Sequence, residues 1–343
     1  MNDDVRSRPP TPPAASLSKE ARSWASMLLA LPSNPAPAPD DVEAWRAATR
    51  APSSAEQIAA IALATTGAVP TGAEVDVAEL PLSEAVVQIG TPRELGPGDT
   101  RVLLNVHGGA FTTGGGETTR VATQFMAGCY GCTVWGVDYR MPPDHPFPAA
   151  LDDCLEAYRR LLDRHDPASI AICGLSAGGN LVAALLLRIH EESLPMPRAV
   201  VLNSPLVDLT LSGDTIVSKP YGDEGSIAPH VAIYAGGNDV RHPHLSPLRA
   251  AIPADWPPTV LISGTRDYLL SDTVRMHRAL LDSGVRAELH VFDGAPHGMF
   301  GGTAPEDRAV VSQIRRFLDS VGVGTADLPR TSCPDARDEA GGR

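Results

Sequence analysis

The chain has 343 residues, of which 43% are hydrophobic and 20% charged, a composition typical of one large globular domain or of one domain with a small lid. Its 41 acidic residues outnumber 28 basic ones and give a formal net charge of −13, which argues against a nucleic-acid partner because such binding needs a basic surface. No run approaches ~18 continuous apolar residues, so we expect no transmembrane helix and no membrane partner.

The N-terminal region reads as a disordered stretch followed by helices. Residues 1–15 are rich in proline and polar groups, begin with acids and lack the apolar core of a signal peptide. Residues 17–31 form an amphipathic pattern, with Trp24, Met27, Leu28 and Leu31 at helical spacing. Asp40 and Ser53 each begin a capping pattern with a glutamate three residues later, which predicts two further short helices.

Strand signals begin with a hairpin at residues 75–82 and 85–89, and strands and helices then alternate. Nearly continuous apolar runs predict buried strands, and longer runs without Gly or Pro predict helices. The expected strands are 102–106, 133–137, 169–173, 199–202, 259–262 and 287–292, and the expected helices are 118–128, 149–165, 180–190, 271–283 and 305–321. This alternation predicts an α/β fold with a mostly parallel central sheet and helices on both faces, whose ligand crevice lies at the carboxyl ends of the strands.

Two segments do not fit the alternation of strands and helices. Residues 209–248 contain Gly, Pro, Asp and Tyr in no clear period, and the helices within 16–70 precede the sheet. We interpret 16–70 and 209–248 together as a helical cap over a core formed by 71–208 and 249–322, followed by a flexible tail at 323–343.

Five scattered cysteines give no redox or metal signature. Cys129 and Cys132 form a lone C-x-x-C, with Cys129 expected at the end of a helix and Cys132 at the start of a strand, so we interpret the spacing as coincidence. We expect reduced thiols, a cytoplasmic location, and neither a metal nor an organic cofactor.

The most informative stretch is Gly174-Leu175-Ser176-Ala177-Gly178, a G-x-S-x-G sequence between the predicted strand 169–173 and the predicted helix 180–190. This context is typical of a nucleophile elbow, in which a tight turn exposes the serine at the N-terminus of a helix. The alternative is an ordinary glycine-rich loop between a strand and a helix.

A second glycine loop follows the predicted strand 102–106 as His107-Gly108-Gly109-Ala110. Consecutive glycines let backbone N–H groups approach a ligand closely. We expect the N–H groups of Gly108 and Gly109, together with that of Ala177, to form an oxyanion hole.

A serine nucleophile needs a base, and the base needs an acid that fixes its tautomer. Only His297, among the histidines compared, follows a late strand and precedes a glycine. Asp267 follows the predicted strand 259–262 and gives the chain order Ser, Asp, His. Asp272 is the competing acid, although its position suggests that it caps the next helix.

Five motifs in order resemble the bacterial hormone-sensitive-lipase family of α/β-hydrolases, over roughly residues 75–320. They are His107-Gly-Gly-Ala110, the segment 138–150, Gly174-Leu-Ser-Ala-Gly-Gly179, the segment 267–272 and His297-Gly298. The resemblance implies an α/β-hydrolase fold, a carboxylesterase activity on short-chain acyl esters and a cap built from the N-terminal helices and an insertion. It also leaves a homodimer paired through a sheet edge open.

The chain departs from the family pattern at two positions, with Leu175 where many relatives have an acid and Ala110 where they have a third glycine. The Gly174–Gly179 motif resembles the ε-lactone hydrolase branch. Within 138–150 we expect Asp138, Tyr139, Arg140 and Asp144 to support the oxyanion loop rather than to touch the substrate.

The sequence therefore predicts a serine carboxylesterase that acts on a small-molecule ester or lactone through Ser176, Asp267 and His297. Lactone, amide or carbamate hydrolysis on the same triad stays open. A receptor without enzymatic activity usually lacks the base, and a lipase needs a larger apolar lid than residues 209–248 offer.

Overall fold

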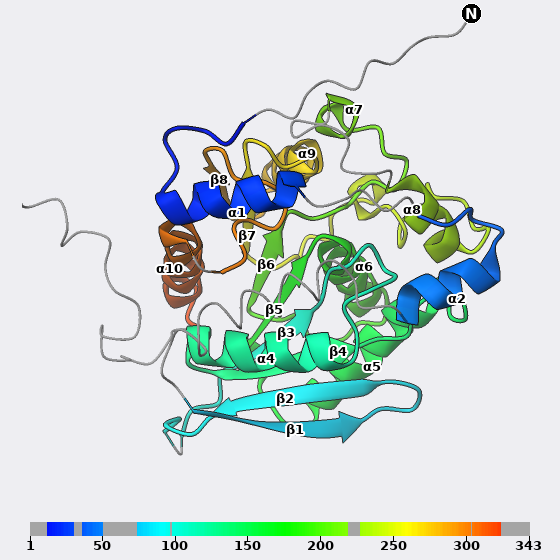
Figure 1. The fold of residues 1–343 in the computed structure, drawn as a ribbon. Helices are drawn as coiled ribbons and strands as arrows, with labels where there is room; N and C mark the ends of the chain where they lie inside the picture. Colours follow the sequence, from blue (N-terminus) through cyan, green and yellow to red (C-terminus); the bar gives the residue numbers. More distant parts are fainter. Residues whose placement is uncertain are drawn as a thin grey trace, which may run out of the picture.

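The computed structural model describes residues 12–30, 36–50, 74–96, 98–218, 227–302 and 304–323. An eight-stranded sheet lies at its centre, in the order β1-β2-β4-β3-β5-β6-β7-β8 (Figure 1). The strands are β1 (Val75–Pro81), β2 (Val86–Pro92), β3 (Val102–Val106), β4 (Thr133–Asp138), β5 (Ile170–Leu175), β6 (Ala199–Asn203), β7 (Thr259–Gly264) and β8 (Ala287–Phe292). The helix predicted after Ser53 lies outside the described residues.

The sheet is parallel except at one edge. β1 and β2 form the predicted antiparallel hairpin, and β2 pairs antiparallel with β4. All pairs from β4 onward along the sheet are parallel. The mostly parallel sheet that the alternation of strands and helices predicted is therefore confirmed.

Helices cover both faces of the sheet because successive strand residues point to opposite sides. On β3, Leu104 packs into the core beneath α5, α6 and α9, whereas Leu103 packs into the core beneath α4 and α10. These helices are α4 (Glu117–Tyr130), α5 (Ala149–Leu162), α6 (Ala177–Glu191), α9 (Leu270–Asp282) and α10 (Pro305–Ser320). The five helices predicted from residue 118 onward are thus present, with ends shifted by a few residues.

The first helix, α1 (Lys19–Ala30), lies against α10 (Figure 1). Its buried residues are Ala21 and Ala25, while Trp24, on the face predicted to be apolar, is only partly buried. Ser18 ties the helix start to α10 through two hydrogen bonds of 2.8 Å to Glu306. Small side chains therefore set this contact, because they let the helix approach the core closely.

The structure describes the last four residues of the N-terminal stretch that we expected to be disordered. Residues 12–15 are placed, and the Pro12 carbonyl accepts a hydrogen bond of 2.6 Å from Arg266. Residues 1–11 of that prediction, and 324–343 of the predicted tail, lie outside the described residues.

Within its described residues, 209–218 and 227–248, the segment 209–248 carries two short α-helices, α7 (Asp214–Ser218) and α8 (Ala228–Ala235). The N-terminal helix α2 (Val42–Arg50) reaches α8, where the rings of Trp45 and His230 meet edge to face at 5.0 Å between centroids. Of the two described N-terminal helices, α2 therefore accompanies the 209–248 segment, and α1 packs on the core.

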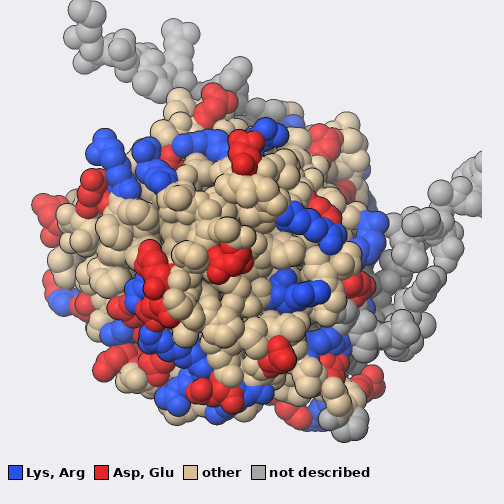
Figure 2. Space-filling model, turned by 180° about the vertical axis from the view of Figure 1, so that it is seen from behind, with Lys and Arg blue, Asp and Glu red and all other residues tan. Residues whose placement is uncertain are grey.

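The surface carries both charge signs. Figure 2 shows acidic and basic side chains interspersed over the face opposite to that of Figure 1. Among the helices within the described ranges, none combines the length and the apolar character of a membrane span.

Candidate active site

The strand register brings several loops to one edge of the sheet. Val106 of β3 lies opposite Gly174 of β5, and Asn203 of β6 lies opposite Leu175. On the other side of β6, β7 and β8 end together, with Gly264 opposite Phe292. The loops that follow β3, β5, β6, β7 and β8 therefore all begin at the carboxyl edge, where a parallel sheet binds its ligands.

The turn after β5 is strained in the way a nucleophile elbow requires. Ser176 has φ 56° and ψ −119° and lies between the end of β5 and the first residue of α6. A Cβ added at Gly178 would lie 2.0 Å from the Val106 carbonyl oxygen, and one at Gly174 would lie 2.3 Å from that of Gly178. The main chain thus requires glycine at both positions, and Ala177 presents its N–H at the helix start.

The loop after β3 runs directly beside this serine. A Cβ added at Gly108 would lie 2.9 Å from the Leu175 carbonyl oxygen and 3.4 Å from the Cβ of Ser176. The two glycine loops of the sequence prediction therefore meet.

The loop after β3, residues 107–113, is called the oxyanion loop here after its predicted role, and its backbone orientation is fixed by bonds to its carbonyl groups. The Tyr139 hydroxyl donates to the His107 carbonyl at 3.0 Å, and His107 Nδ1 donates to the Gly108 carbonyl at 2.7 Å. The two rings stack with centroids 4.0 Å apart. In a trans peptide the C=O and the following N–H point in opposite directions, so these bonds turn the N–H groups of Gly108 and Gly109 the other way.

The next carbonyl group of the loop, that of Gly109, is also held by hydrogen bonds. The Gly109 carbonyl accepts the N–H groups of Thr112 and Thr113, each at 3.0 Å. Ala110 and Phe111 then have positive φ angles of 54° and 65°. Ala110, where the family pattern has a third glycine, is thus in the left-handed region.

Asp267 and His297 form a hydrogen-bonded pair in which the carboxyl group is buried and the imidazole is partly exposed. His297 Nδ1 lies 3.0 Å from Asp267 Oδ1, and Asp267 is fully buried. Ser263 Oγ donates to its other oxygen at 2.7 Å, and the Leu269 N–H donates to Oδ1 at 2.9 Å. Burial disfavours the charged form, but the His297 charge and the hydrogen bonds from His297, Ser204 and Leu269 hold the pKa of Asp267 below its ordinary value.

The end of β6 connects this pair to the elbow. The Ser176 N–H donates to the Asn203 carbonyl at 3.0 Å, and the next residue, Ser204, contributes to the lowered pKa of Asp267. Ser204 and Ser263 were not found from the sequence, since an isolated serine has no diagnostic spacing. The one signal available in the sequence was the place of these serines at the carboxyl ends of β6 and β7.

Asp272, the competing acid, has a different role from the one predicted. Its Oδ2 accepts the backbone N–H groups of Val207 and Asp208, each at 3.0 Å, instead of capping its own helix. Burial raises the pKa of Asp272 to about 7. The side chain therefore anchors the segment between β6 and residues 209–248, while His297 pairs with Asp267.

Of the four residues of the segment 138–150 that we expected to support the oxyanion loop, the described contacts bring one, Tyr139, to it. Its hydroxyl donates to the His107 carbonyl of the oxyanion loop. The other three hold neighbouring elements: Asp138 accepts the Gly116 N–H at 3.0 Å, Arg140 pairs with Asp153 at 2.8 Å and Asp144 pairs with Arg46 of α2 at 2.7 Å.

The cysteine pair lies as predicted, with Cys129 near the end of α4 and Cys132 just before β4. The described cysteines are free thiols. Within the described ranges, His, Cys, Asp and Glu side chains form no cluster of three or more that could hold a metal ion.

Comparison with known proteins agrees with this geometry. The family model described as alpha/beta hydrolase fold matches residues 103–301. The chain is 31% identical to an acetyl-hydrolase of Streptomyces hygroscopicus over 64% of this chain and 76% of that protein. It is 30% identical to an esterase of Acinetobacter venetianus over 65% of this chain and 76% of that protein.

Solved structures give the same result. The esterase E25 superposes with a TM-score of 0.76 at 31% identity, covering 90% of this chain and 95% of that chain. An esterase from the bacterial hormone-sensitive lipase family superposes with a TM-score of 0.72 at 28% identity, covering 90% and 99%. The chain therefore belongs to the α/β-hydrolase fold family, and within it to the bacterial hormone-sensitive-lipase-like carboxylesterases.

Proposed function

We propose that Ser176, His297 and Asp267 form the catalytic triad of a serine carboxylesterase that hydrolyses small to medium acyl esters. The observation that carries the proposal is the 3.0 Å bond between His297 and the buried Asp267, at the same sheet edge as the strained Ser176. The names of the relatives, an acetyl-hydrolase and several esterases, favour a short acyl group.

In the acylation step, His297 Nε2 takes the proton of Ser176 as the hydroxyl attacks the ester carbonyl. Asp267, held ionised by its hydrogen bonds, stabilises the imidazolium and keeps the Nδ1 proton in place. His297 then protonates the leaving alcohol, and an acyl group remains on Ser176. A water molecule, deprotonated by His297, attacks this acyl-enzyme and releases the acid.

The negative charge of the tetrahedral intermediate needs donors that are already oriented. We assign the N–H groups of Gly108, Gly109 and Ala177 to this role. Support comes from the carbonyl bonds that turn the loop N–H groups away from Tyr139 and from the contact of Gly108 with Ser176. Neither a metal nor an organic cofactor is required by these steps.

Location and assembly are part of the same proposal. We infer a cytoplasmic location from the free, largely buried thiols of Cys132, Cys154 and Cys173, since disulfides are rare in that compartment. A homodimer would pair through β8, an edge strand on which Val291 is 41% exposed.

The test is the substitution Ser176→Ala, assayed with a series of p-nitrophenyl esters from acetate to dodecanoate and with caprolactone. Turnover of p-nitrophenyl butyrate should fall to the uncatalysed rate while the circular dichroism spectrum stays unchanged. Retention of full activity in the variant would overturn the proposal, and the ester series identifies the preferred acyl length.

A further inference from the structure

The helix α8 presents two side chains to consecutive residues of the oxyanion loop. His230 Nδ1 lies 2.8 Å from the Thr112 hydroxyl. The rings of Tyr234 and Phe111 stack with centroids 3.8 Å apart and planes 1° from parallel. His230 and Tyr234 are four residues apart on a helix and so share one face, which therefore contacts the loop at two adjacent positions.

The loop has a conformation that needs such support. Ala110 and Phe111 both have positive φ angles, a region that is unfavourable for residues with a side chain. Phe111 is fully buried, and the Thr112 N–H bonds the Gly109 carbonyl. A shift of residues 111 and 112 would therefore be transmitted directly to the peptide group that follows the proposed donor Gly109.

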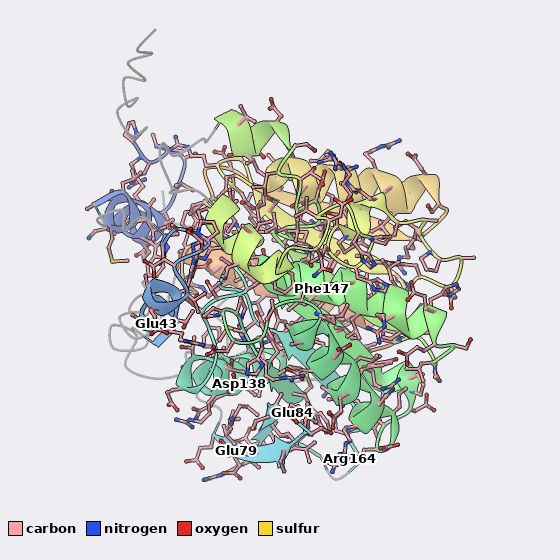
Figure 3. The ribbon with its side chains drawn as sticks, turned by 90° about the vertical axis from the view of Figure 1, so that its right-hand side faces the viewer. Glu43, Glu79, Glu84, Asp138, Phe147 and Arg164 are labelled. Atoms are coloured by element: carbon pink, nitrogen blue, oxygen red, sulfur yellow. The ribbon has the colours of Figure 1, made fainter. Side chains whose placement is uncertain are left out.

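The N-terminal helix α2 and the segment 138–150 hold α8 in place. Trp45 of α2, only 1% exposed, meets the His230 ring edge to face. The Phe147 N–H donates to the Tyr234 carbonyl at 2.8 Å, and Phe147 lies beside α8 (Figure 3). Burial lowers the pKa of His230, so the ring is neutral near pH 7, and Nδ1 shares one hydrogen bond with the Thr112 hydroxyl.

We propose that His230 and Tyr234 are positioning residues for the oxyanion hole, so that the cap contributes to the rate of the chemical step through Thr112 and Phe111. This inference rests on the proposed function. Loss of the support should lower kcat and leave KM nearly unchanged, because a misplaced donor affects the transition state more than the bound ester.

The test compares Thr112→Val, His230→Phe and the double variant in hydrolysis of p-nitrophenyl butyrate. Removing an oxyanion donor outright costs about 100-fold or more in kcat, so we expect about a 10-fold loss when a donor is only displaced. The kcat of the double variant should fall no further than that of either single variant, since both substitutions remove the same hydrogen bond. Thr112→Ser, which keeps the hydroxyl, should restore the activity.

Two further variants address the ring stack and the helix. Tyr234→Leu should lower kcat, whereas Tyr234→Phe, which keeps the ring, should have the kcat of the wild type. Ala232→Ser, on the exposed side of α8, is the matched control and should behave as the wild type. Melting temperatures are measured for all variants, and His230→Phe tests the same bond if Thr112→Val does not fold.

Unchanged kcat in His230→Phe and Thr112→Val, or a rise in KM alone, would overturn this inference. Losses that multiply in the double variant would overturn it as well, because the two residues would then act separately. Failure of the proposed function is distinguishable, since in that case the wild-type protein itself would show no ester turnover.

Discussion

The elbow around Ser176 and the oxyanion loop beside it are held in different ways. The elbow is fixed by its own main chain: β5 leads into it, α6 leads out, and Gly174 and Gly178 allow contacts that no side chain would permit. The oxyanion loop makes bonds of its own as well, but it also depends on side chains from distant segments, namely Tyr139, His230 and Tyr234.

This difference predicts different sensitivities. A change in the elbow should disturb folding, because the same glycines pack the central strands against α6. A change in the supports of the oxyanion loop should mainly disturb catalysis, because the strands beneath it remain intact. The variants below test the contrast, beginning with the largest expected effect.

Gly178→Ala should abolish the folded state or cost more than about 4 kcal/mol of unfolding free energy. The added Cβ would lie 2.0 Å from the Val106 carbonyl oxygen, and a main-chain contact cannot be relieved by a rotamer change. In an ordinary helix the same substitution stabilises by about 1 kcal/mol, so the predicted sign is opposite. Urea unfolding measures the change in unfolding free energy. Gly98→Ala is the control, because a Cβ added at Gly98 would meet no atom of the described residues within 4 Å, its chain neighbours aside.

The pH dependence of stability should change in Asp272→Asn. Burial raises the pKa of Asp272 from 3.8 to about 7, so between these values the folded chain binds more protons here than the unfolded chain. This residue therefore makes the free energy of unfolding fall as pH rises through that window, by at most about 1.4 kcal/mol per pH unit.

Urea unfolding of wild type and Asp272→Asn at several pH values checks this prediction. Between pH 4 and pH 7 the unfolding free energy of the wild type should fall relative to that of Asp272→Asn. A difference that is constant over this window would contradict the prediction. Asp214→Asn, at an exposed position of α7, controls for the loss of one acidic group.

Tyr139→Phe should lower kcat by about 10-fold with little change in KM, and should cost about 1 kcal/mol of stability. The ring stack on His107 is kept, but the bond that orients the Gly108 N–H is lost. Tyr158→Phe is the matched control, because its hydroxyl bonds the Pro195 carbonyl away from the site. Equal kcat losses in both variants would count against the role assigned to Tyr139.

Ala110→Gly should have the smallest effect, a gain of less than about 1 kcal/mol in stability, because glycine relieves the positive φ but adds freedom to the unfolded chain. Ala232→Gly, in α8, should instead lose about 1 kcal/mol. Thermal unfolding distinguishes the two signs. A loss of stability in Ala110→Gly would show that the left-handed turn is not strained.

The sheet and the elbow could be predicted from the sequence because their signals are local. Buried strands such as β3 read as continuous apolar runs, and the glycines around Ser176 lie within a few positions. His297 and Asp267 followed from strand order and from the resemblance. The pairing of these two side chains, at 3.0 Å, is consistent with that prediction.

The contacts of residues 209–248, and those of the segment just before them, could not be predicted, because they join positions far apart in the chain. His230 meets Thr112, which is 118 positions away, and Asp272 reaches Val207, which is 65 positions away. A lone histidine or aspartate has no periodicity that identifies such a partner. The placement of α1 on α10 was missed for a similar reason, since it depends on the small residues Ala21 and Ala25 and not on the large apolar ones.

The most direct test of the central claim is the rate at which a fluorophosphonate labels Ser176 in wild type, Asp267→Asn and Asp272→Asn, with the labelled peptide identified by mass spectrometry. We predict labelling at Ser176 that slows by about 1,000-fold or more in Asp267→Asn, because His297 loses the acid that fixes its tautomer. Asp272→Asn should label within a few-fold of wild type. Labelling at another residue, or an unchanged rate in Asp267→Asn, would contradict the account.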